Sequence, residues 1–115
     1  MNTKPDLTYL SEMSGGDKGL MTEIFDIYLE QVPEFIADLK AGLEKNNFEL
    51  IYQVSHKAKT SVAIVGFNAL SAEFKKLEQS AKCGFENERP LELVNALIAW
   101  LMETQNEITR LKNSL

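Results

Sequence analysis

The chain has little of the chemistry that many active sites use, since its 115 residues contain a single cysteine and a single histidine. One cysteine, Cys83, excludes an intrachain disulfide and a cysteine-rich zinc site, so we expect it to pack at the end of a helix. One histidine, His56, excludes the di-metal carboxylate bundles, which need a Glu-x-x-His motif on two helices. Methionine and phenylalanine fall on apolar helical stripes and are interpreted as core. We therefore expect neither a metal nor another cofactor.

Basic residues are also few, because 12 Lys and Arg stand against 17 Asp and Glu, giving a formal net charge of -5. Nucleic acids and anionic membrane surfaces are bound through clustered Lys and Arg, so we expect neither as a partner. The longest apolar runs, VAIVGF and ALIAWLM, are too short to span a bilayer, and the N-terminus lacks the regions of a signal peptide. These features predict a cytoplasmic protein.

Signals for β-strands are missing as well. No sustained alternation of apolar and polar residues occurs, and no Asn-Gly or Asp-Gly hairpin dipeptide. Amphipathic helical patterns follow one another instead. We expect Pro33 to separate two helices near Gln31, because proline fits the first turn of a helix but not its interior. The predicted fold is all-α, an antiparallel four-helix bundle with one or two additional N-terminal helices, forming one domain over residues 1–115.

Residues with preferred positions at helix ends predict where the helices begin and stop. The expected N-caps are Asp6, Asp17, Asn47 and Asn68, and Pro90 is expected to open the last helix. Glycines end helices because they accept the left-handed conformation. The expected stops are Gly15-Gly16, Gly66 and Gly84.

The helix predicted after Asn47 carries the histidine. Its buried face is formed by Ile51, Val54, Ala58, Val62 and Val65. At about 100° per residue, His56 points roughly 160° away from the centre of that stripe. The packing that fixes this helix should therefore leave the imidazole facing water.

The sequence HKAKTS, which begins at His56, is followed by Gly66 and Leu70. This run resembles the signature of histidine-containing phosphotransfer (HPt) domains, the carrier modules of multi-step phosphorelays. That signature has a lysine three residues after the histidine, a small-residue patch, a glycine ten residues on and a leucine four beyond. The family usually has glycine four residues after the histidine, where this chain has Thr60. Threonine is still small, so we interpret it as a limit on partner choice or rate.

The resemblance implies a carrier that accepts and donates a phosphoryl group on His56, with the outer nitrogen Nε2 as the acceptor. The exchange would run between aspartates of receiver domains, in a response regulator or a hybrid histidine kinase. Lys59 lies one turn further along the same side and would stabilise the phosphoryl oxygens. Lys57 points further round the helix and is the weaker candidate for this role.

The neighbours of the histidine are candidates for partner docking. Thr60 and Ala63 are small and lie just beyond it, which leaves a shallow surface for a partner, while Tyr52 and Gln53 flank the other side. Each also has a plain structural interpretation. Thr60 and Ala63 would then be solvent-facing helix residues, and Tyr52 would pack against a neighbouring helix.

Enzymatic alternatives lack their motifs. Gly15-Gly16 does not belong to a phosphate-binding loop, so autonomous kinase activity is not expected. Ser55 and Ser61 do not lie on the histidine's side of the helix, which argues against a hydrolase triad. A helical adaptor that binds a receiver or kinase domain without being phosphorylated remains the alternative function. Since no long heptad pattern occurs, we expect a monomer, and Met1 with a complete set of helices favours a free-standing protein.

Overall fold

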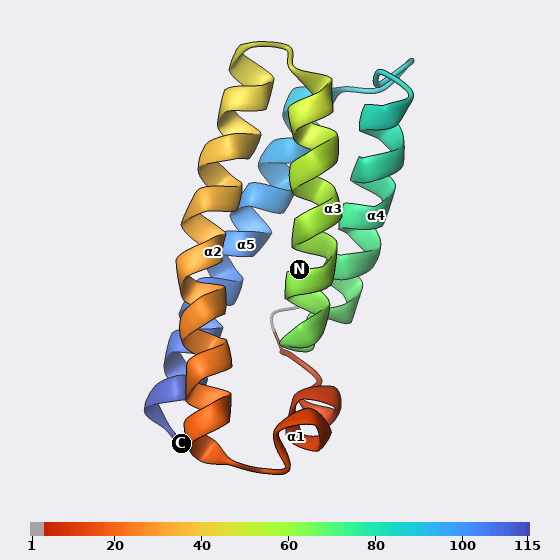
Figure 1. Cartoon of the computed structure of the whole chain (residues 1–115). Coiled ribbons are helices and arrows are strands. Elements are labelled where there is room, and N and C mark those ends of the chain that lie inside the picture. The colour runs from red at the N-terminus through yellow and green to blue at the C-terminus, as the bar shows by residue number, and fades with distance from the viewer. Residues whose placement is uncertain (1–3) are drawn as a thin grey trace.

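The computed structural model describes residues 4–115 and contains five helices, with no strand among those residues. The helices are α1 (Thr8–Ser14), α2 (Lys18–Glu44), α3 (Phe48–Ile64), α4 (Asn68–Lys82) and α5 (Pro90–Asn113). The four long helices form an antiparallel bundle, and α1 lies beneath the end of α3 (Figure 1). The molecule as a whole measures 45 × 22 × 20 Å. The predicted fold class, a four-helix bundle with an additional N-terminal helix, is confirmed.

Most of the predicted helix ends are found in the structure. The side chains of Asp17 and Asn47 each accept a hydrogen bond from the backbone N–H three residues on, at 3.0 and 3.1 Å. Each bond satisfies one of the amides that a helix start leaves without an intrahelical acceptor. Pro90 is the first residue of α5, as predicted. The prediction for Asn68 is wrong by one residue, because α4 begins at Asn68 itself and Phe67 takes the N-cap position without a side-chain bond.

The predicted boundary near Gln31 is wrong, because α2 continues through Pro33. The proline ring is exposed, whereas Val32, Phe35 and Leu39 are buried on one stripe of the helix. Burying a large apolar side chain contributes about 1.5–3 kcal/mol, and proline inside a helix costs about 3 kcal/mol. Three buried side chains around the proline therefore outweigh the missing backbone hydrogen bond. The two helices predicted from the sequence are one helix.

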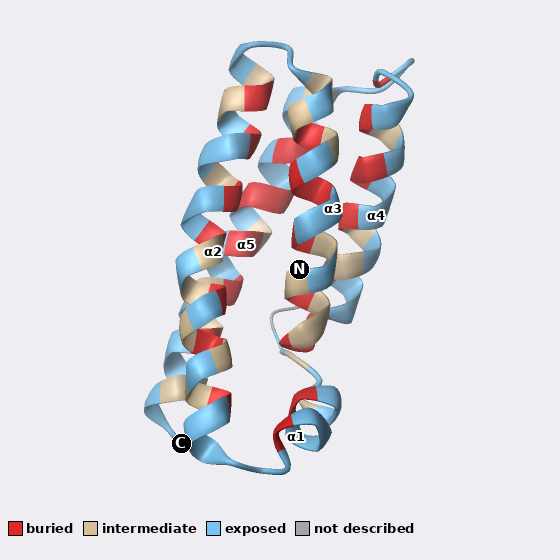
Figure 2. Ribbon diagram, viewed as in Figure 1, coloured by how far each residue is buried: buried red, intermediate tan, exposed pale blue. Residues whose placement is uncertain are grey.

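The apolar stripes of the long helices meet along the axis of the bundle (Figure 2). One polar link crosses this core, where the buried Tyr28 hydroxyl and the Thr104 hydroxyl are 2.6 Å apart. Thr104 also donates to the carbonyl of Leu101 at 2.6 Å, so neither hydroxyl is left unpaired. Between residues 4 and 115, none of the helices combines the length and the apolar character needed to cross a membrane.

The end of α4 agrees with the prediction for Gly84 but not with that for Cys83. Gly84 follows the helix with a φ of 73°, in the left-handed region that glycine favours. Cys83 is the C-cap residue, at the helix end as predicted, but it is exposed, so the expectation that it packs there is wrong. The side chain that covers this end of the core is Phe85, which is buried against the ring of Phe48.

Gly66 ends α3, as predicted, and also holds the segment that leads into α1. Its φ is 92°, and its carbonyl accepts the backbone N–H of Asp6 at 2.9 Å. A Cβ at this position would lie 2.1 Å from the carbonyl oxygen of Asp6. Only glycine therefore allows the two backbones to approach this closely.

Gly66→Ala should lower the free energy of unfolding by about 1–3 kcal/mol through backbone strain, and the clash with Asp6 should add to the loss. We also expect faster amide exchange at Asp6, because its bond to the Gly66 carbonyl is displaced. Denaturant unfolding and hydrogen exchange measure the two effects. Gly84→Ala is the matched control, since Gly84 has a positive φ but no neighbouring atom within 4 Å of an added Cβ. Equal losses in the two variants would show that the contact with Asp6 has no structural role.

Candidate functional site

His56 lies on α3 with its imidazole at the surface. The side chain is 62% exposed, in agreement with the sequence analysis. Its Nδ1 atom is not free, because it lies 2.9 Å from Oε1 of Glu78 on the neighbouring helix α4. The ring is therefore open to solvent on one side and held by a carboxylate on the other.

Glu78 joins His56 to Lys59. Its second carboxylate oxygen, Oε2, accepts a hydrogen bond from Lys59 Nζ at 2.7 Å. The Glu78 side chain is only 8% exposed. The hydrogen bond from Lys59 lowers the pKa of Glu78, burial acts in the opposite direction, and the bond from His56 lowers the pKa further. Glu78 is therefore a carboxylate at neutral pH, and it carries a negative charge beside the imidazole.

This arrangement selects one form of the imidazole ring. An ionised carboxylate only accepts hydrogen bonds, so Nδ1 must carry the proton in its bond to Glu78. In the neutral ring the other nitrogen, Nε2, then has a free lone pair. Because the side chain is mostly exposed, this lone pair is accessible to an incoming electrophile. The geometry supports the prediction that Nε2 is the reactive nitrogen.

The short connection between α3 and α4 brings these side chains together. Val65, Gly66 and Phe67 turn the chain so that α4 packs along α3. A side-chain bond fixes their relative position, since the Ser71 hydroxyl donates to the carbonyl of Lys59 at 2.8 Å. Lys59 is thereby held through its backbone by Ser71 and through its side chain by Glu78.

The predicted docking residues differ in their surroundings. Thr60 and Ala63 line a hollow of about 500 Å³ that also borders Lys59. Tyr52 is half-buried against the core, as its structural interpretation anticipated. Gln53 is exposed and donates to Glu49 Oε1 at 3.2 Å. The hollow beside Lys59 therefore favours Thr60 and Ala63 as contacts for a partner.

Lys57 is exposed and, within residues 4–115, takes part in no hydrogen bond or ion pair with His56, Lys59 or Glu78. The same part of the chain holds no group of three or more His, Cys, Asp or Glu side chains that could bind a metal ion. The polar network at the histidine therefore consists of His56, Lys59 and Glu78.

Sequence reasoning missed Glu78, which lies 22 positions after the histidine. One signal was available. Glu78 follows Leu77 at the edge of the apolar stripe of α4, and a glutamate in such a position is rarely buried unless it is paired. Lys59 and His56, on the flank of the preceding helix, are the pair that it needs.

Comparison with known proteins agrees with the all-helical bundle. The family model described as the Hpt domain matches residues 23–114, and the chain belongs to this family. Membership supports a histidine phosphotransfer role in two-component signalling. No curated protein matches the chain.

A solved structure shares the fold. The chain is similar to histidine-containing phosphotransfer protein B (HptB) from Pseudomonas aeruginosa PAO1, with a TM-score of 0.86 and 18% sequence identity. The similarity covers 96% of this chain and 96% of HptB. At this identity the likeness establishes the fold, and the roles of individual residues depend on the geometry described above.

Proposed function

We propose that this protein is a phosphorelay carrier that accepts and donates a phosphoryl group on Nε2 of His56. The observation that carries the proposal is the hydrogen bond between Nδ1 and the buried carboxylate of Glu78, which in the neutral ring places the proton on Nδ1 and the lone pair on the exposed Nε2. The donor and acceptor are aspartates of receiver domains, in a response regulator or a hybrid histidine kinase. We include the whole chain, residues 1–115, in one monomeric cytoplasmic module.

The chemistry follows from the positions of the three side chains. The Nε2 lone pair attacks the phosphorus of an aspartyl phosphate, so that an N–P bond forms while the bond to the aspartate oxygen breaks and its carboxylate leaves. Positive charge develops on the imidazole during this step. The carboxylate of Glu78, 2.9 Å from Nδ1, stabilises that charge. The reverse reaction uses the same contacts.

Lys59 is placed to act on the moving phosphoryl group. An ammonium has three N–H donors, and only one is needed for the bond to Glu78. The others are available to phosphoryl oxygens as the group approaches His56. In this proposal the protein has no kinase activity of its own, because the aspartyl phosphate of the donor is a mixed anhydride that is already reactive and the receiver domain supplies the remaining catalytic groups.

The test is to mix the protein with a receiver domain phosphorylated at its aspartate and to follow both intact masses with time. We expect one phosphoryl group to appear on this chain as the receiver loses its own, and the product to be stable to base and labile to acid. If receivers bind while their phosphate is lost only by hydrolysis, the protein is a non-phosphorylated adaptor.

Thr60 gives a prediction about the rate of transfer. Its side chain is exposed beside Lys59, at the position where the family usually has glycine. Thr60→Gly should speed transfer several-fold by allowing a closer approach, although glycine inside a helix costs about 0.5–1 kcal/mol of stability. Thr60→Tyr should slow transfer about tenfold or more, which corresponds to about 1.4 kcal/mol of lost contact.

Rapid-quench measurement of phosphoryl transfer from a receiver checks these rates. Phosphorylation by phosphoramidate, a small donor that needs no docking surface, should change little in either Thr60 variant. Equal rates from the receiver in wild type, Thr60→Gly and Thr60→Tyr would show that the partner does not approach this turn of α3.

A further inference from the structure

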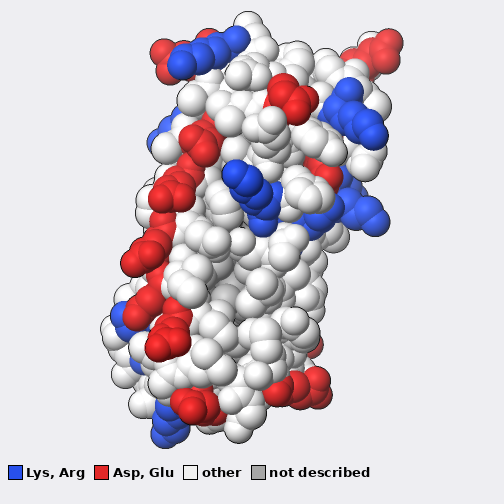
Figure 3. All heavy atoms as spheres, in the orientation of Figure 1, with Lys and Arg blue, Asp and Glu red and all other residues white. Residues whose placement is uncertain are grey.

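Acidic side chains form a line along α2. The acidic ridge, as we name it, consists of Glu23, Glu30, Glu34 and Asp38. Their spacing places them on one face of the helix, since residues three or four positions apart are neighbours on a helix surface. Figure 3 shows acidic side chains running down α2, beside a surface that reaches toward α3 and is uncharged except for a basic side chain in its upper part. The ridge thus borders the face that carries the histidine's helix.

The charge of the ridge is not balanced within the structure. Asp26, on the same helix, is paired with Lys112 of α5. The four ridge residues, by contrast, take part in no ion pair within residues 4–115. Lys18 and Lys40 belong to the same helix but lie on its other side at 100° per residue. The ridge therefore presents its negative charge to solvent.

Repulsion within the ridge also lowers the stability of α2. Glu30 and Glu34 are four residues apart, as are Glu34 and Asp38, and like charges at this spacing destabilise a helix. These side chains are all exposed, so they neither pack in the core nor cap a helix. Their contribution is better explained by contact with something outside the chain.

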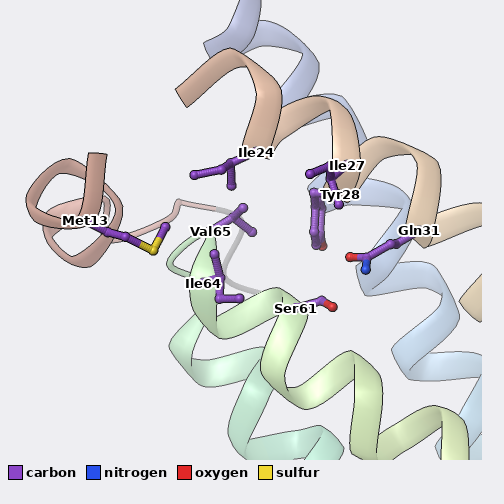
Figure 4. A pocket seen from close by; sticks show the side chains of 8 residues that line it. All are labelled: Met13, Ile24, Ile27, Tyr28, Gln31, Ser61, Ile64 and Val65. Atoms are coloured by element: carbon purple, nitrogen blue, oxygen red, sulfur yellow. The ribbon is translucent and has the colours of Figure 1, made fainter. Parts of the chain in front are cut away.

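An apolar cleft of about 190 Å³ lies between the ridge and the end of α3. Side chains from α1, α2 and α3 point into it (Figure 4). They include Met13, Ile24, Ile27, Gln31, Ser61 and Ile64. Ile27 is 54% exposed and Met13 is 44% exposed, so both present apolar surface at the cleft. A partner that covers this cleft would bury apolar surface and meet the ridge at its border.

The ridge lies level with the phosphate-accepting turn of α3. Gly42 of α2 lies against Ile51 near one end of α3, and Gln31 shares the cleft with Ser61 near the other end. Both helices rise by about 1.5 Å per residue, and they run antiparallel. Glu34 and Asp38 fall between these two contacts, so they lie level with the turn that holds His56.

A partner that reaches His56 would therefore extend over α2 as well. A standard protein interface buries about 800 Å² on each side, which corresponds to a disc of about 16 Å radius. Packed helix axes are about 8–10 Å apart, so α2 falls well inside such a disc centred on α3. The surface of the partner that faces α2 then lies against unpaired carboxylates.

We propose that the acidic ridge selects, among receiver domains, those whose docking surface carries Lys or Arg beside the apolar residues that fill the cleft. This inference rests on the proposed function for the class of partner and adds the charge that distinguishes one receiver from another. Opposite charges across the border of an interface act mainly by raising the association rate and excluding partners of the wrong sign. The ridge would do so for this carrier.

Charge reversal on the full chain tests the proposal. The variant is Glu30→Lys/Glu34→Lys, and the matched control is Glu86→Lys/Glu103→Lys, which changes the net charge equally at exposed positions away from α2. The probe is the receiver domain from the same organism that binds the wild type most tightly, whether or not it exchanges phosphate. Stopped-flow binding at low and high salt gives the association rates, and phosphoramidate treatment reports on His56 itself.

We expect the ridge variant to associate about tenfold more slowly than wild type at low salt, and this difference to vanish in high salt, where charges are screened. The control variant should change the rate much less. Replacing the receiver's basic residues by Glu should restore fast association with the ridge variant. Equal slowing by both variants, or no slowing by either, would overturn the proposal.

The same experiment separates this inference from the proposed function. In the ridge variant, phosphoramidate should still phosphorylate His56 as fast as in wild type. If His56 takes no phosphate from either donor while the receiver still binds in a ridge-dependent way, the carrier function fails and the docking surface stands. If His56 is phosphorylated normally but binding ignores the ridge, the docking proposal fails alone.

Discussion

His56→Gln is expected to reduce phosphoryl uptake from a phosphorylated receiver to the background rate. An amide nitrogen has no available lone pair, so glutamine cannot replace Nε2 as a nucleophile. The fold should be retained, because the His56 side chain is 62% exposed and Glu78 keeps its hydrogen bond from Lys59. Intact-mass spectrometry after mixing with the receiver measures uptake, and circular dichroism checks the helices.

Binding distinguishes the carrier from the adaptor. His56→Gln should still bind the receiver with nearly unchanged affinity, since the apolar cleft and the α3 surface are intact. Glu103→Gln, an exposed change on α5, serves as the control and should transfer phosphate normally. Continued uptake of one acid-labile phosphoryl group by His56→Gln would mean that another residue is the acceptor. Unchanged signalling by this variant in cells would favour the adaptor.

The features that the sequence predicted well are those decided by a few neighbouring residues. Asp17 and Asn47 cap helices because a short polar side chain reaches an amide three residues on, whatever the rest of the chain does. Gly66 ends α3 through its own positive φ. The exposure of His56 followed from helical periodicity alone, since the opposite face of α3 is apolar.

The features that were missed are decided by packing between helices. Pro33 is a local signal for a boundary, and burial of the residues around it overrides that signal. The pairing of Glu78 with His56 depends on how far α4 is shifted along α3 and how it is rotated. Periodicity indicates which face of each helix is buried, but it does not determine that alignment. The sequence therefore located the proposed nucleophile, His56, and not the carboxylate that is hydrogen-bonded to it.

Glu78→Ala is expected to slow phosphoryl transfer by about 10–100-fold, because hydrogen bonds to charged groups contribute about 1.5–3 kcal/mol. Without the carboxylate, Nδ1 no longer has to hold the proton, so among neutral rings the fraction with a free Nε2 falls. Developing positive charge on the imidazole also loses its neighbour. Transfer kinetics measure the rate, and nitrogen NMR of the imidazole reports which ring nitrogen carries the proton.

Glu73→Ala, an exposed change on the same helix, is the control for helix stability and should leave both readouts unchanged. Glu78→Gln should fall between wild type and Glu78→Ala, because an amide oxygen can accept from Nδ1–H but carries no charge. Slow transfer in Glu78→Ala with an unchanged proton position would mean that Glu78 stabilises positive charge on the imidazole but does not fix the proton on Nδ1. Normal transfer would remove it from the mechanism.

The lowered pKa of Glu78 also links the site to stability in acid. A carboxyl group whose pKa is lower in the folded state stabilises the fold fully above its unfolded-state pKa of about 4.3. That contribution is lost as the pH falls through the lower folded-state value. Wild type should therefore exceed Glu78→Gln in free energy of unfolding at neutral pH, and the gap should close in acid as Glu78 becomes protonated. Denaturant unfolding of both proteins across this range measures the gap, and a gap independent of pH would show that the carboxylate charge does not hold α3 and α4 together.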